Sequence, residues 1–171
     1  MLSLSDNEFS VISFLVRNFT ERLTIRNIAQ RLEFSPAGVF NILKKLEKEN
    51  IVTGQKLGTG LFYSMNFENR IAERLAAIVL LYSDKSEKVS DEHLKQAKAA
   101  IFDKKNLLLI KEVSIVESSI PGVNVMVKTE EEFSLLLKNR DAEILQLLRK
   151  GTVLFGEDRI IAIIKENAPR L

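Results

Sequence analysis

The sequence contains no cysteine and only one histidine, His93, among its 171 residues. Disulfide bonds and thiolate metal sites are therefore excluded, and a single imidazole cannot assemble a zinc site alone. A chain without cysteine fits a reducing intracellular compartment. We therefore expect a cytoplasmic protein that carries no metal and no other cofactor.

Long apolar runs are also missing. The longest, residues 75–82, is far too short to span a bilayer, and the opening MLSLSDNEFS lacks the basic and apolar regions of a signal peptide. The hydrophobic fraction of 46% is nevertheless enough to bury the core of one large domain or two small ones. The composition predicts a soluble, folded protein without a membrane partner.

The net charge is small, formally +2, and by itself gives little support for a polyanionic partner. Its distribution is more informative. Residues 1–66 contain eight of the 25 basic and six of the 23 acidic side chains, which leaves 17 of each sign in the remainder. The positive excess therefore lies entirely in the N-terminal segment.

The first 50 residues have the apolar spacing of three helices. The first helix is expected after Ser5, which is followed three residues later by the glutamate of a capping box, and the second after the N-cap Thr24. A tight turn at residues 33–35 precedes the third, where Ser35 is the N-cap and Pro36 occupies a position that needs no N–H. This order predicts a helix-turn-helix.

The third helix, expected over residues 35–49, should have two distinct faces. Its apolar side chains recur at helical spacing and must face the core. They are Val39, Ile42, Leu43 and Leu46. The opposite face suits the major groove of DNA, where an amide can pair with an adenine edge and a lysine with guanine or phosphate. That face consists of Pro36, Ala37, Phe40, Asn41, Lys44, Lys45 and Lys48.

Two features of that face have alternative explanations. The lysines also fit a solvated charged surface, which is the usual meaning of such a run on a helix. Phe40 fits contact with thymine methyl groups, but equally fits packing against a wing or a second subunit.

The segment that follows favours DNA binding. Two strands are expected at residues 52–57 and 61–66, joined by the sequence Gly58-Thr59-Gly60. Glycines permit positive φ, and the small tip can approach a minor groove or a phosphate. Lys56 is expected to contact the DNA backbone. Few other folds share this order of three helices followed by a two-stranded wing, residues 52–66.

Residues 24–66 resemble the winged-helix regulators of the MarR and ArsR type. They match the pattern I-x-x-I-A-x-x-L, then S-x-x-x-V-x-x-x-L-x-x-L, and then have a glycine followed closely by a tyrosine in the wing. The resemblance implies a winged helix-turn-helix over residues 1–67 that binds double-stranded DNA. The contacts that it implies fall on Ser35, Pro36, Ala37, Asn41, Lys44, Lys56 and Thr59. Pro36, Ala37 and Phe40 stand where relatives often have Arg or Ser, so we expect modest base reading, with phosphate and shape contacts contributing more.

Residues 68–90 are expected to connect two domains. The first part, residues 68–82, is a helix with charges mainly near its start, which indicates either core or a subunit interface. A helix after the wing commonly dimerises in winged-helix regulators, so the resemblance implies a homodimer. Residues 83–90 are polar and break the helical pattern, as is typical of a linker.

Residues 91–171 are expected to form a small α/β domain, which makes the whole chain α+β. Helices are expected at residues 91–102, from the N-cap Thr129 to residue 150 with a break near Asn139, and at residues 159–167. Strands are expected at residues 106–117, 123–128 and 152–155, with a turn at residues 120–122.

Residues 123–167 resemble the closing part of small nucleotidyltransferase-fold proteins of the minimal, antitoxin-like kind. The shared pattern is V-x-V-x-x-x-T-x-E-E-F, a helix, and then K-G-x-x-L-F-G-E. Active members hold a triphosphate on a G-S motif and two metal ions on a D-x-D pair. Here VLLYSDKSEK lacks the glycine, and the D-x-D positions fall on Lys104 and Asn106 or, in another alignment, on His93. The resemblance therefore implies an inactive domain without catalytic or metal-binding residues.

Three functions are consistent with the sequence. The favoured one is a DNA-binding transcriptional regulator whose C-terminal domain serves dimerisation, sensing of a small effector or binding of a protein partner. The second is a nucleotidyltransferase-type enzyme that a DNA-binding module targets. The third is an antitoxin-like protein-interaction module whose winged helix packs against another chain.

Overall fold

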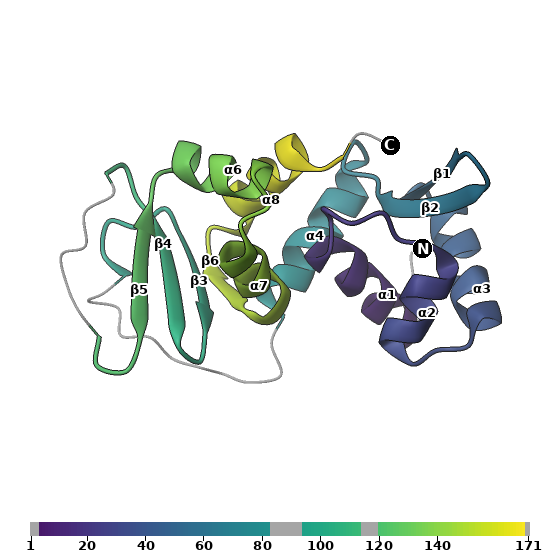
Figure 1. Cartoon of the computed structure of the whole chain (residues 1–171), viewed down its shortest axis with the longest axis horizontal. Coiled ribbons are helices and arrows are strands. Elements are labelled where there is room, and N and C mark those ends of the chain that lie inside the picture. The colour runs from purple at the N-terminus through teal and green to yellow at the C-terminus, as the bar shows by residue number, and fades with distance from the viewer. Residues whose placement is uncertain (1–3, 83–93, 114–119, 170–171) are drawn as a thin grey trace. The chain divides into compact units, whose positions relative to one another are not determined.

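The computed structural model describes residues 4–82, 94–113 and 120–169 (Figure 1). The chain divides into two compact units, one formed by Met1–Val79 with Ala168–Leu171 and the other by Leu80–Asn167. The predicted linker at residues 83–90 lies outside the described residues. None of the helices in the described ranges is long and apolar enough to cross a membrane.

The first unit contains helices followed by a two-stranded sheet, as predicted (Figure 1). Its elements are α1 (Asp6–Arg17), α2 (Ile25–Leu32), α3 (Pro36–Lys48), β1 (Val52–Leu57), β2 (Gly60–Met65) and most of α4 (Arg70–Leu81). The strands pair antiparallel, and Leu23 adds an isolated bridge to Tyr63 on the outer side of β2. The mixed helix and sheet content confirms the α+β class.

Local side-chain chemistry begins each of the first three helices. Ser5 and Glu8 form the predicted capping box, and Thr24 forms one with Asn27. The Ser35 hydroxyl accepts from the Gly38 N–H at 3.0 Å. Because these caps satisfy N–H groups that no helical carbonyl reaches, the three starts are defined by sequence alone.

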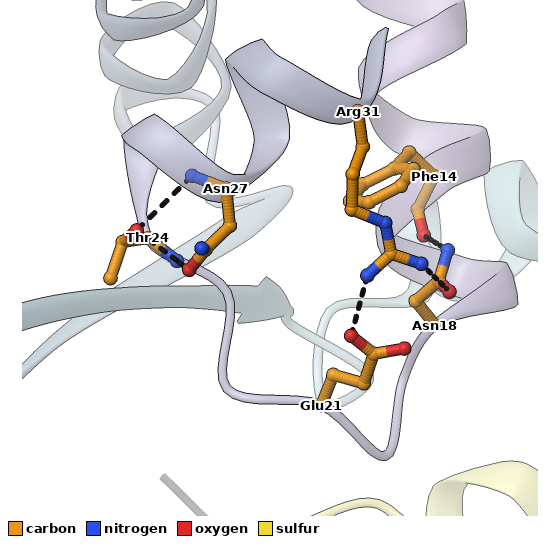
Figure 2. A network of polar contacts seen from close by, with 6 residues as sticks. All are labelled: Phe14, Asn18, Glu21, Thr24, Asn27 and Arg31. Carbon is orange, nitrogen blue, oxygen red and sulfur yellow. Dashed lines mark hydrogen bonds and ion pairs between the residues drawn. The ribbon is translucent and has the colours of Figure 1, made fainter.

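A polar cluster holds α2 against the end of α1 (Figure 2). The Arg31 guanidinium donates to the Glu21 carboxylate at 2.6 Å and to the Asn18 side-chain oxygen at 2.8 Å. It also lies 4.7 Å from the centroid of the Phe14 ring, and the Asn18 amide donates to the Phe14 carbonyl at 2.8 Å. Planar Arg31 thus combines ion pairing with stacking and fixes the α1–α2 corner.

The second unit is built on a mixed sheet with strand order β5-β4-β3-β6 within the described residues. The strands are β3 (Ala99–Asp103), β4 (Asn106–Ile110), β5 (Asn124–Lys128) and β6 (Thr152–Phe155). β3 pairs antiparallel with β4 and β6, and β4 pairs parallel with β5. Figure 1 shows α6 (Glu130–Lys138), α7 (Ala142–Lys150) and α8 (Glu157–Asn167) together on one side of this sheet.

Both faces of this sheet are covered. On one face Ala100, Leu107, Leu109 and Val127 form a buried cluster, against which other apolar side chains, including that of Phe155, pack. The intervening side chains of the same strands, such as Ile101 and Leu108, are also buried. Strands that are buried on both faces have near-continuous apolar sequences, and β4 is one of these.

The predicted helix at residues 91–102 is wrong over residues 95–102, where a turn leads into β3; residues 91–93 lie outside the described residues. Alanine favours helix locally, but Ala99 and Ala100 are fully buried in a hairpin with β4. The Asp103 carboxylate closes that hairpin by accepting from the N–H groups of Lys105 and Asn106, at 3.1 and 3.0 Å. Tertiary burial therefore overrides helix propensity here.

The strand predicted at residues 106–117 is shorter, since β4 ends at Ile110 and residues 114–117 lie outside the described residues, but the predicted strands β5 and β6 and the helices after Thr129 are found. Thr129 and Glu132 form the second capping box, and α6 ends at the predicted break, where Arg140 has φ 55°. Asp141 then caps α7 by accepting from two backbone N–H groups. The last helix begins at Glu157, two residues earlier than predicted.

Two glycines of the second unit allow a test of close packing. Gly156 and Gly122 both have positive φ, 77° and 78°. A Cβ at Gly156 would lie about 2.5 Å or less from Ala99 Cβ and the Lys98 carbonyl oxygen, whereas nothing lies within 4 Å at Gly122. We expect Gly122→Ala to cost about 1 kcal/mol of unfolding free energy and Gly156→Ala about 3 kcal/mol or more, because steric overlap adds to the left-handed backbone strain. Urea denaturation of both variants measures this; equal losses would contradict it.

Candidate nucleic-acid interface

All ten residues that were predicted to contact DNA have exposed side chains. They are Ser35, Pro36, Ala37, Phe40, Asn41, Lys44, Lys45, Lys48, Lys56 and Thr59. Eight lie on α3 or at its N-cap, and two lie on the wing that β1 and β2 form. The exposed surface of α3 with the wing is called the basic face below.

The orientation of α3 follows from burial of its apolar side. Val39, Leu43 and Leu46 are completely buried, while Ile42, which was predicted in the core, is only partly buried. Because positions three and four apart share one face of a helix, burying these three side chains turns Asn41, Lys44 and Lys48 outward.

Phe40 is a large apolar side chain on the basic face and is 44% exposed. The Lys44 ammonium nitrogen lies 6.0 Å from the centroid of its ring, at the outer limit of a cation–π contact. The ring therefore keeps much of its area available to a partner.

Lys44 is also paired with an acidic neighbour. Its ammonium nitrogen lies 2.9 Å from Glu47 Oε2, one helical turn away. The hydrogen bond that Lys44 donates to Glu47 raises the pKa of Lys44 above its usual value, so the lysine remains charged. Part of its field is nevertheless compensated within the protein.

Lys45 connects α3 to the beginning of α1. Its ammonium nitrogen lies 2.7 Å from Glu8 Oε1, and the other oxygen of that carboxylate accepts from the Ser5 N–H at 2.8 Å. Although burial raises the pKa of Glu8, the hydrogen bonds from Lys45 and Ser5 outweigh it and hold this pKa below its usual value. The sequence revealed Glu8 only as a capping residue, because its partner is 37 positions away.

Lys48 and Lys56 differ from these two lysines. Both are exposed, and no side-chain partner is found for either in the part of the chain that the structure describes. Their charge is therefore fully available to a polyanion, which makes them the cleanest candidates for phosphate contacts.

Sequence reasoning missed Glu47 and Tyr63, which lie where α3 meets the wing. Tyr63 is buried on β2, opposite Gly54 of β1. A Cβ at Gly54 would lie 2.8 Å from Glu47 Oε1 and 3.0 Å from Tyr63 Cε1. A glycine inside a strand often marks a place where another group approaches the backbone closely. Gly54 was therefore the feature of the sequence that could have indicated this contact.

The polar residues at one end of the second sheet include one position that the nucleotidyltransferase resemblance assigns to a metal-binding carboxylate. Asn106 donates to Asp103 at 3.1 Å and accepts from the Asn124 amide at 3.2 Å. Asn124 also lies within hydrogen-bond distance of Glu143, at 3.3 Å. The alternative position, His93, lies outside the described residues. Within the described ranges no group of three or more His, Cys, Asp or Glu side chains is arranged to hold a metal ion.

Comparison with known families agrees with the geometry of the first unit. Residues 2–59 match the MarR family, which is about a third of the 171 residues. The matched segment contains α1, α2, α3 and β1 and ends at the tip of the wing. This supports the predicted winged helix-turn-helix at the N-terminus. No curated protein matches the chain.

The Lys45–Glu8 pair predicts a pH-dependent contribution to stability. Because the pKa of Glu8 is lowered on folding, its stabilising effect is complete above the unfolded value of about 4.5 and is lost as the pH falls through the folded value. We expect Glu8→Gln to lower the unfolding free energy by about 1 kcal/mol at pH 7 and by progressively less below pH 4.5, since the amide retains the cap but not the charge.

Urea denaturation at several pH values measures this effect. Glu33→Gln is the matched control, because Glu33 is an exposed carboxylate in the same unit. A loss of stability that is the same at pH 3 and pH 7 would show that the ion pair is not its source.

Proposed function

We propose that the protein is a transcriptional regulator that binds double-stranded DNA through α3 and the wing. The observation that carries the proposal is the basic face, an exposed polar surface on a helix whose other side is buried. The match of residues 2–59 to the MarR family supports this assignment. A helix of this kind fits the major groove, and a wing tip as small as Gly58-Thr59 suits the adjacent backbone or minor groove.

The residues of the basic face divide by chemistry. Asn41 is the candidate for reading a base edge, because its amide can both donate and accept. Lys48 and Lys56 are assigned to phosphates, and Thr59 at the wing tip has a hydroxyl that can donate to one. Phe40 is assigned to thymine methyl groups. With one amide among these side chains, phosphate contacts provide most of the affinity.

Removal of single lysines from the basic face tests the proposal. Lys48→Ala and Lys56→Ala should each weaken binding to a mixed-sequence 20-base-pair duplex and each reduce the slope of log affinity against log salt by about 1, because each removes one phosphate contact. Fluorescence anisotropy between roughly 50 and 200 mM salt measures both quantities.

Lys104→Ala, which removes an exposed lysine of the second unit, is the matched control and should leave the slope unchanged. Binding that does not depend on salt, or whose affinity and salt slope are unchanged by the loss of both Lys48 and Lys56, would refute DNA binding by this face. Absence of binding would instead favour the alternative in which the winged helix packs against another protein chain.

We also propose that α4 mediates a homodimer. Ile71, Ile78, Leu81 and Tyr82 lie on one side of this helix and its end, and are 41–58% exposed, while Ala72, Ala76 and Val79 on the other side are buried. An apolar stripe of this length is costly in water and fits a self-complementary contact. Two winged helices then reach two half-sites of a palindrome.

A charge on this stripe should separate the subunits. Ile78→Asp is expected to convert a dimer into a folded monomer and to weaken DNA binding, since one winged helix contacts only a few base pairs. Sedimentation equilibrium and circular dichroism measure mass and folding. Leu135→Asp, at an equally exposed leucine of α6, is the control and should leave the mass unchanged. A wild-type protein that is monomeric at micromolar concentration, free and with DNA, would contradict the proposal.

For the second unit we propose a non-catalytic role in dimerisation, effector sensing or partner binding, as part of a degenerate nucleotidyltransferase-like domain. The positions that the resemblance gives to metal-binding carboxylates hold Lys104 and Asn106. An ammonium group repels a metal ion, and the Asn106 amide already exchanges hydrogen bonds with Asp103 and Asn124. In an active enzyme these positions would bind two metal ions. The contacts of Asn106 support a structural role here instead.

A further inference from the structure

Tyr63 is the starting point, because its hydroxyl group is buried without a partner. The side chain is 1% exposed, and within the described residues no hydrogen bond to its hydroxyl oxygen is found. A buried hydroxyl that makes no hydrogen bond destabilises a protein and calls for an explanation. Phenylalanine would fill the same space without that cost, so the hydroxyl is not required by packing.

The Glu47 carboxylate is an acceptor close to this hydroxyl. Gly54 has no side chain, and the space next to its Cα is occupied from one side by Glu47 Oε1 and from the other by the Cε1 edge of the Tyr63 ring. The ring edge adjoins the carbon that carries the hydroxyl group. The Glu47 side chain is flexible and partly exposed, so a change of its rotamer can turn the carboxylate toward this hydroxyl.

In the free protein Glu47 is engaged with Lys44 instead, at 2.9 Å through Oε2. Lys44 is on the basic face, where the proposed DNA phosphates would attract it. Once Lys44 turns to a phosphate, the Glu47 carboxylate has lost its cation in a region of negative potential. A second donor beside this carboxylate would then stabilise it by a charge-assisted hydrogen bond.

We propose, building on the DNA-binding function above, that Glu47 sets the affinity for DNA by exchanging partners. On binding, Lys44 leaves Glu47 for a phosphate, and the carboxylate then accepts a hydrogen bond from the Tyr63 hydroxyl. The hydroxyl is therefore unsatisfied in the free protein and satisfied in the complex. Burial and the neighbouring Glu47 both raise the pKa of Tyr63, which keeps it protonated and able to donate.

The exchange predicts effects of opposite sign for one substitution. Tyr63→Phe removes an unsatisfied polar group from the free protein, so its melting temperature should equal or exceed that of the wild type. The same substitution removes the donor that Glu47 needs in the complex, so affinity for duplex DNA should fall about three- to tenfold, the range expected for one hydrogen bond. A hydroxyl with only a structural role would not separate the two measurements.

A double-mutant cycle identifies Glu47 as the acceptor. In a Glu47→Ala background Tyr63→Phe should no longer change the affinity, because the group that it serves is gone. Glu47→Ala alone should bind DNA more tightly than Glu49→Ala, which removes the same charge from the exposed C-cap of α3. Anisotropy with the mixed-sequence duplex supplies all these affinities, and circular dichroism confirms that each variant is folded.

A direct readout comes from the ζ-carbon chemical shift of Tyr63, which reports hydrogen bonding of the hydroxyl group. It should change on addition of DNA to the wild type and not to Glu47→Ala. A wild type that does not bind the duplex would overturn the DNA-binding function itself. Salt-dependent wild-type binding with an unchanged affinity for Tyr63→Phe, or with equal losses in both backgrounds, would overturn the exchange alone.

Discussion

Burial of one side of α3 is the constraint on which the rest of the first unit depends. Val39, Leu43 and Leu46 have no exposed surface, and each such side chain contributes roughly 1.5–3 kcal/mol relative to exposure. The rotation of the helix about its axis is therefore fixed by the hydrophobic effect, not by any polar contact. This burial also sets the outward orientation of Asn41, Lys48 and the other exposed residues of α3. Their orientation therefore requires no stabilising contact of their own.

The polar contacts around α3 join it and its neighbours to other elements of the unit. Arg31 fixes the corner between α1 and α2, Lys45 ties α3 to Glu8, and Glu47 lies against the wing at Gly54. Exposed ion pairs contribute little to stability, but each of these contacts connects two elements. They add specific polar contacts between elements that the apolar core already packs together.

The parts of the fold that were predictable are those that neighbouring residues specify. The caps at Ser5, Thr24, Ser35 and Thr129, and the break near Asn139, each depend on residues within one helical turn, and all were found. The strand at Ala99–Asp103 was missed, since alanines favour helix and only pairing with β4 makes them a strand. The Glu8–Lys45 ion pair and the approach of Glu47 and Tyr63 to Gly54 bring together positions that are separated in the chain, so no local pattern reveals them.

The contact between Lys45 and Glu8 also makes the start of the chain part of the basic face. The Ser5 N–H donates to the same carboxylate that holds Lys45, so the first turn of α1 and the outward helix share one charged group. The position of Lys45 on the basic face therefore depends on how α1 begins.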